Sequence, residues 1–181
     1  AYEICACLVG SEMCVRDRFL CIALFLFGQA DKNGIRFIEG EKWENVLKAA
    51  QEQDKYIFMD CYTSWCGPCK ASFPAMQKAV NHFAEDKDVI FLFINTLESK
   101  KDLKEIVSKY MTDHQYNFNV LFDTQDETTK QYTVIESYKA KGIPAKFIID
   151  KTGNIRFKLV GFSGSDDETV EELKAMIEIL K

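Results

Sequence analysis

Apolar residues recur along the chain in two alternating patterns. Short runs of aromatic and β-branched residues, bounded by polar or glycine-containing segments, are typical of buried strands. These runs occupy residues 35–38, 56–62, 89–94, 119–122, 146–150 and 155–160. Between them, apolar residues return every three or four positions, which predicts helices. The predicted helices cover residues 41–53, a segment that ends near Phe83, residues 103–110 and 128–138, and a last segment capped by Ser165 or Asp166.

The order of these elements predicts an α/β fold. Strands that alternate with helices form parallel βαβ units. Near the end of the chain, two predicted strands are joined directly through residues 151–154, a glycine-containing turn that indicates an antiparallel hairpin. The pattern therefore predicts a sheet flanked by helices, with a hairpin and a final helix.

Composition limits the size and the partners of this fold. The chain has 181 residues, of which 47% are hydrophobic, and this is enough for one well-filled core. Its 23 basic and 28 acidic residues give a net charge of −5, so it offers no basic field for a phosphate backbone. We expect no nucleic-acid partner.

The first 30 residues have the outline of a secretory signal. An apolar run at residues 19–28 follows Arg16 and Arg18, and small residues end at Ala30. The run is too short to cross a bilayer as a helix. Because such a signal would begin naturally at Met13, residues 1–30 are interpreted as a signal peptide or an N-terminal extension, with a buried N-terminal element as the alternative.

Seven cysteines fall into two groups. Four lie within the first 21 residues, and three, Cys61, Cys66 and Cys69, lie where a predicted strand gives way to a helix. Cleavage after Ala30 would leave one C-x-x-C pair and one buried thiol. The pattern therefore predicts an oxidising, extracytoplasmic compartment, with the cytoplasm as the alternative.

Cys66 and Cys69 are three residues apart at a predicted helix start, a spacing within reach of a disulfide. The helix N-terminus favours a thiolate at Cys66, which predicts Cys66 as the nucleophile and Cys69 as the resolving thiol. A zinc site would need two further ligands, but no second C-x-x-C exists and His82 and His114 are isolated. We expect neither a metal nor a cofactor.

Residues 58–70, which contain Trp65-Cys66-Gly67-Pro68-Cys69-Lys70, closely resemble the active-site segment of thioredoxins. The resemblance implies that Asp60 is the buried acid that exchanges a proton with the resolving cysteine. It also implies that Ile143 and Pro144 form a cis-proline loop and that Gly161, with Trp65, completes a substrate-docking surface.

The chain between Cys69 and Pro144 is longer than in a minimal thioredoxin, and its layout is similar to the TlpA and ResA type of extracytoplasmic reductase. The resemblance therefore implies that residues 31–181 form a thioredoxin fold, with a central mixed sheet flanked by helices and an insertion before the cis-proline loop. Ser72 is a departure, because that type commonly carries a glutamate there.

The leading functional hypothesis is a monomeric protein-disulfide reductase that acts on exported proteins and is kept reduced by a membrane electron-transfer partner. A dithiol oxidase or isomerase is the alternative within the same chemistry. A thioredoxin-fold binding or chaperone module with a static disulfide is the alternative from another class.

Overall fold

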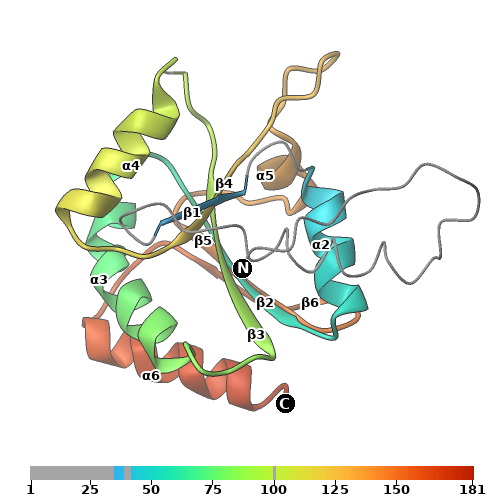
Figure 1. Ribbon diagram of the computed structural model, residues 1–181, viewed down its shortest axis with the longest axis vertical. Coiled ribbons are helices and arrows are strands. Elements are labelled where there is room, and N and C mark those ends of the chain that lie inside the picture. Colours follow the sequence, from blue (N-terminus) through green and yellow to red (C-terminus); the bar gives the residue numbers. More distant parts are fainter. Residues whose placement is uncertain (1–34, 39–41, 100) are drawn as a thin grey trace, which may run out of the picture.

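The computed structural model describes residues 35–38, 42–99 and 101–181, and a twisted sheet runs through the middle of this part (Figure 1). The strands are β1 (Arg36–Ile38), β2 (Tyr56–Tyr62), β3 (Val89–Asn95), β4 (Asn119–Phe122), β5 (Ala145–Ile149) and β6 (Ile155–Val160). The helices are α2 (Trp43–Glu52), α3 (Gly67–His82), α4 (Leu103–Asp113), α5 (Thr133–Ser137) and α6 (Asp166–Glu178).

The sheet is mixed, in the order β1-β4-β3-β2-β5-β6. Strands β1, β4, β3 and β2 pair in parallel, whereas β5 pairs antiparallel with both β2 and β6. Strand β2 is therefore central, and every one of its residues is buried. The predicted α/β class and the thioredoxin-like mixed sheet are confirmed.

Two hydrophobic cores lie on opposite faces of the sheet. Alternate residues of β2, such as Phe58 and Tyr62, share one core with Cys66, Cys69 and residues of α3, α4 and α6. The intervening residues share the other core with α2 and α5. Because side chains alternate between the faces of a strand, the position of each β2 residue fixes the face on which its chemistry lies.

Most predicted elements occur where the pattern placed them. Ser165, one of the two expected caps, is the N-cap of α6 and forms a capping box with Glu168. The side chain of each residue accepts a hydrogen bond from the backbone amide of the other, which satisfies free amide groups at the start of the helix.

The predicted helix over residues 128–138 is wrong, because only α5 is helical there. The Asp126 carboxylate accepts hydrogen bonds from the amides of Thr128 and Thr129, and Gln125 pairs with Tyr132 in an antiparallel bridge. These local bonds hold the backbone in a turn instead of a helix.

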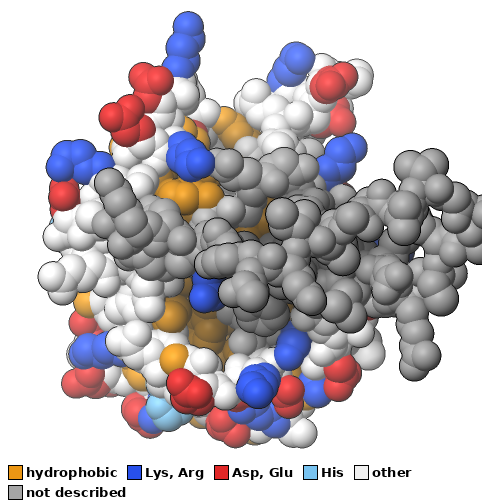
Figure 2. Space-filling model, viewed as in Figure 1, with side chains coloured by type: hydrophobic (Ala, Val, Ile, Leu, Met, Phe, Trp, Pro, Cys, Tyr) orange, Lys and Arg blue, Asp and Glu red, His pale blue; other side chains and the backbone are white. Residues whose placement is uncertain are grey.

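The expectations for residues 1–30 lie outside the described residues. Within the part that the structure describes, no helix is both long and apolar enough to cross a membrane. On the face drawn in Figure 2, basic and acidic side chains are interspersed around the described surface, in keeping with the small net charge.

Candidate redox-active site

A disulfide joins Cys66 and Cys69, whose Cα atoms lie 5.3 Å apart. Cys66 is the N-cap of α3, and its Sγ accepts a hydrogen bond of 3.1 Å from the amide of Cys69. Gly67 and Pro68 form the first turn of the helix, where a proline loses no hydrogen bond. The sequence therefore places the Cys66 sulfur at the positive end of a 16-residue helix.

The two cysteines differ in their access to solvent. Cys66 is 5% exposed and Cys69 is completely buried, while the neighbouring Trp65 is 60% exposed. Ser72, the departure from the TlpA and ResA pattern, is buried one turn further along α3 and donates its hydroxyl to the Cys69 carbonyl. Cys66 is thus the sulfur of the pair that a partner molecule can reach.

Asp60 is completely buried in β2, on the same face of the sheet as the disulfide. Its neighbours at alternate positions, Phe58 and Tyr62, belong to the core that contains both cysteines. Burial raises the pKa of Asp60 to about 6, and the opposing charge of Lys146 limits the rise. A carboxyl with this pKa can take up and release a proton near neutral pH.

Lys146 is a site residue that the sequence interpretation missed. It lies in β5 directly opposite Asp60, and its Nζ is 3.7 Å from the Asp60 carboxylate. The available signal was a single charged residue inside the apolar run Ala145-Lys146-Phe147-Ile148-Ile149. Buried lysines are rare without a partner, so this residue could have been paired with a buried acid before the structure was known.

Ile143, Pro144 and Gly161 lie at the same end of the sheet as the disulfide. The Ile143–Pro144 peptide bond is cis, and the next residue, Ala145, pairs with Cys61 near the end of β2. Gly161 has φ of +88° and donates its amide to the Pro144 carbonyl at 2.8 Å. A left-handed conformation favours glycine, which explains the residue type at this position.

Glu98 joins the active-site turn to the segment after β3. Its carboxylate accepts hydrogen bonds from the Ser64 amide and from the Asn95 side chain, and its carbonyl accepts one from the Tyr132 hydroxyl. The adjacent Leu97 has φ of +53° and is 42% exposed, an uncommon backbone state for a leucine. The Glu98 contacts bring the exposed Leu97 segment beside the turn that carries Trp65.

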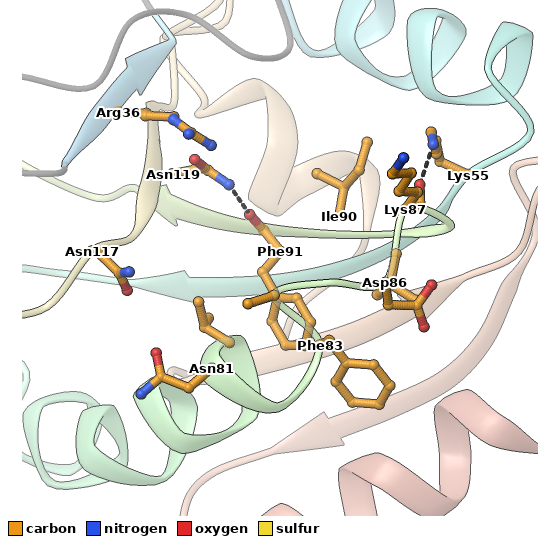
Figure 3. A pocket seen from close by; sticks show the side chains of 13 residues that line it. Arg36, Lys55, Asn81, Phe83, Asp86, Lys87, Ile90, Phe91, Asn117 and Asn119 are labelled. Carbon is orange, nitrogen blue, oxygen red and sulfur yellow. Dashed lines mark hydrogen bonds between the residues drawn. The ribbon is translucent and has the colours of Figure 1, made fainter.

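A pocket of about 600 Å³ lies at the start of β3, away from the disulfide (Figure 3). Asn119 donates to the Phe91 carbonyl in this pocket, while Lys55 donates to the Lys87 carbonyl farther along its wall. Strand β3 runs parallel to β2, whose far end leads to Cys66. The pocket is therefore separate from the redox site.

No group of three or more metal-ligating side chains occurs among residues 35–38, 42–99 and 101–181. His82 and His114 belong to different segments, and His114 contacts the Tyr110 carbonyl through Nδ1. Cys61 is a buried free thiol on the face opposite the disulfide, and burial raises its pKa, with a smaller contribution from Asp60. Cys61 is therefore suited to packing, because a protonated thiol is a poor nucleophile.

Comparisons with known proteins agree with this arrangement. The chain is 30% identical over 109 residues to thiol-disulfide oxidoreductase ResA of Bacillus subtilis. The aligned region covers 60% of this chain and 55% of that relative. It is 25% identical over 141 residues to ResA of Bacillus cereus, covering 78% of this chain and 70% of that protein.

The fold is also found in solved structures. The crystal structure of StoA from Bacillus subtilis aligns with 69% of this chain and 84% of that one, with a TM-score of 0.54 and 21% identity. Residues 38–158 match the model of the AhpC/TSA family. Since that match covers more than half of the chain, and the sheet, helices and disulfide are arranged accordingly, the chain belongs to the thioredoxin-like AhpC/TSA family.

Proposed function

We propose that the protein is a thiol-disulfide oxidoreductase that reduces disulfide bonds of exported proteins. The observation that carries this proposal is the Cys66–Cys69 disulfide at the start of α3, on the same face of the sheet as the buried acid Asp60. A dithiol in this position can donate two electrons to another disulfide, and a group with a pKa of about 6 can handle the proton.

The reaction begins with the reduced pair. The Cys66 thiolate, stabilised by the amide groups at the start of α3, attacks one sulfur of the substrate disulfide. The substrate S–S bond breaks, its second sulfur leaves as a thiolate, and Cys66 becomes joined to the substrate as a mixed disulfide.

The second step releases the substrate. The Cys69 thiol gives its proton to Asp60, and the resulting thiolate attacks Cys66. The Cys66–Cys69 bond forms, the bond from Cys66 to the substrate breaks, and the substrate leaves with both electrons. A dithiol partner, which we propose to be a membrane electron-transfer protein, then reduces the pair again.

The substrate-docking surface is proposed to consist of Trp65, Ile143, Pro144 and Gly161. The exposed indole of Trp65 offers apolar contact beside Cys66, and the loop at Pro144 leads directly into β5. An extended substrate segment can add its backbone to such a loop in the manner of a strand. This mode selects an accessible cysteine in an extended segment and leaves the protein free to act as a monomer.

The first test is reduction of insulin by dithiothreitol. The wild-type protein is expected to accelerate it and Cys66→Ser to abolish the acceleration, while Cys61→Ser, which alters the buried thiol on the other face, serves as the matched control. Equal activity of wild type and Cys66→Ser would contradict the proposal and favour a binding module with a static disulfide.

The direction of electron flow distinguishes a reductase from an oxidase. The Gly67-Pro68 pair between the cysteines resembles that of reducing thioredoxins, so we expect a reduction potential of about −270 mV. A potential of about −120 mV would instead identify a dithiol oxidase. Extracytoplasmic location, proposed from the N-terminal pattern and the ResA-named relatives, is tested by fractionation of the source cell.

A further inference from the structure

We propose that Lys146 is a positioning residue for the redox reaction, which keeps Asp60 in its proton-accepting carboxylate form when Cys69 attacks. The proposal rests on the function proposed above and adds a residue to it. It starts from the antiparallel register of β2 and β5, which places Asp60 and Lys146 directly opposite each other. Residues directly opposite in such a pair project to the same face of the sheet.

The two side chains are isolated from solvent and from other hydrogen-bonding groups. Asp60 is completely buried and Lys146 is 3% exposed, and their charged atoms approach to 3.7 Å. Within the described part of the chain, neither carboxylate oxygen of Asp60 nor the Nζ of Lys146 has a hydrogen-bond partner. Each charge is therefore compensated mainly by the other, and loss of one strongly affects the other.

Among the residues that the structure describes, Lys146 is the cation that opposes the effect of burial on Asp60. Its parallel neighbour in β3 is Phe93, which is apolar, and the titratable residues that follow Asp60 along β2 are Cys61 and Tyr62. Burial raises the pKa of both Tyr62 and Cys61, and Asp60 adds to each rise, so these groups stay neutral near pH 7. Lys146 is therefore the cation that sets the charge state of Asp60.

The other groups on this face are the active-site sulfurs and an aromatic ring. Cys69 of α3 belongs to the core on the Asp60 face, and Lys146 Nζ lies 6.0 Å from the ring of Phe162, in the loop after β6. A ring at this distance attracts a cation weakly and helps to hold the lysine in place. The fold thus fixes the ammonium beside Asp60 from β5 and from the loop that follows β6.

The consequence for Asp60 follows from the two opposing effects on its pKa. Burial raises this pKa and Lys146 lowers it, and the balance lies at about 6. Without the ammonium, burial acts unopposed and the pKa rises further. Asp60 would then carry a proton at neutral pH and could not accept the one that Cys69 must lose.

The effect is confined to the second step of the reaction. Attack by Cys66 on the substrate depends on the thiolate at the start of α3 and needs no proton transfer to Asp60. Resolution transfers the Cys69 proton to Asp60, forms the Cys66–Cys69 bond and breaks the bond from Cys66 to the substrate. Loss of Lys146 is therefore expected to slow resolution and spare the first attack.

The reaction of the fully reduced protein with 5,5′-dithiobis(2-nitrobenzoate) separates the two steps. Attack by Cys66 releases one coloured thiolate, and resolution by Cys69 releases the second. In wild type, the rate constant of the second release should rise with pH through about 6. In Lys146→Met, this profile should move to higher pH, and the second release should be at least about tenfold slower at pH 6.

Three further single variants and one double variant test whether the effect comes from the Lys146 charge acting on Asp60. Lys158→Met removes a lysine from the neighbouring β6, where Lys158 pairs with Phe147 on the opposite face, and should behave as wild type. Lys146→Arg keeps the cation and should restore most of the rate. Asp60→Asn should slow the second release, and adding Lys146→Met to it should slow that release no further.

The outcomes separate the two proposals. An unchanged second release in Lys146→Met, equal slowing of both releases, or additive slowing in the double variant would overturn the role of Lys146. Absence of any second release from wild type would instead overturn the proposed function. If Lys146→Met fails to fold, the test is the pH dependence of the second release in Lys146→Arg. Because this variant keeps the cation, a shift of that pH dependence away from wild type would contradict the proposal.

Discussion

At the scale of single residues, the candidate site contains a carboxyl group that is completely buried. Asp60 is completely buried, and burial raises its pKa from the ordinary value of 3.8 to about 6. A buried charge opposes folding unless it is compensated, and the Lys146 ammonium at 3.7 Å compensates it only in part. The charged form of Asp60 therefore costs folding stability, and buried groups with a shifted pKa are common at functional sites.

The pH dependence of stability tests this description of Asp60. Because the pKa is higher in the folded state, the stability that this group contributes is complete below pH 3.8 and is lost as the pH rises through about 6. The loss amounts to about 3 kcal/mol, at about 1.4 kcal/mol for each pKa unit.

The measurement is urea unfolding of oxidised wild type and Asp60→Asn between pH 4 and 7. The stability of wild type relative to the variant should fall across this range. The difference in unfolding free energy between the two proteins also includes the cost of leaving Lys146 unpaired in Asp60→Asn. The test therefore compares how the two free energies change with pH and not their absolute values. Two parallel curves would show that Asp60 titrates at its ordinary value in the folded protein.

The local sequence was enough to predict some residues of the candidate site but not Lys146. Cys66, Cys69 and Asp60 lie within ten consecutive residues, so one local motif was enough to select them. Lys146 lies 86 positions from Asp60 and meets it only through the pairing of β2 with β5. Antiparallel register between distant strands depends on the whole sheet, and a local pattern does not contain it.

At the scale of elements, the turn between β2 and α3 is held in place by residues outside it. The Glu98 carboxylate accepts a hydrogen bond from the Ser64 amide, and the Glu98 carbonyl accepts one from the Tyr132 hydroxyl. Three separate segments therefore meet at Glu98. The backbone of Leu97 is held in the left-handed region beside it. Strain of this kind persists where surrounding contacts fix the chain, and it is common at functional sites.

Glu98→Ala should therefore weaken both the fold and the alignment of the turn. Loss of the carboxylate leaves the partly buried Ser64 amide and the Asn95 side chain without this acceptor, which costs about 1–3 kcal/mol. Insulin reduction should slow more than the reaction with 5,5′-dithiobis(2-nitrobenzoate), since only insulin would use the proposed docking surface.

Thermal unfolding and the two activity assays check the Glu98→Ala prediction. Glu127→Ala, at an exposed position in the 123–132 turn, is the matched control and should leave both readouts near wild type. If Glu98→Ala were as stable and as active as this control, Glu98 would have no role in holding the turn.

Some elements could be predicted from the sequence pattern, whereas the helix over residues 128–138 could not. Strands β2 and β4 begin and end at the predicted residues because continuous apolar runs with polar boundaries define them. A helix was predicted from residue 128, but the Asp126 carboxylate accepts hydrogen bonds from the amides of Thr128 and Thr129 and holds them in a turn. Side-chain competition of this kind is decided by geometry and is weakly encoded in periodicity.

At the scale of the whole molecule, the sheet separates structural and chemical tasks. One face holds the core that contains the disulfide and the Asp60–Lys146 pair, and the other holds the core with the free Cys61 thiol. The disulfide lies at the end of the sheet where β2 and β3 finish, whereas the pocket of Figure 3 lies at the other end. The disulfide and the pocket therefore lie at different ends of the sheet.

The fold as a whole was largely predictable from sequence. Alternation of strand and helix patterns, followed by a hairpin and a helix, leaves few arrangements of a single α/β sheet. The resemblance to thioredoxins implied a central mixed sheet but the strand order came from the structure, because no local feature of β1 indicates that it pairs with β4. The pairing of the edge strand β1 depends on the completed sheet.

The order of attack by the two cysteines is the central claim, and trapping the mixed disulfide tests it most directly. Cys69→Ser, incubated with a disulfide-containing protein such as insulin, should accumulate a covalent adduct that mass spectrometry locates at Cys66. Cys66→Ser should accumulate little, since Cys69 is completely buried. An adduct at Cys61, or equal adducts through Cys69 in Cys66→Ser, would contradict the account.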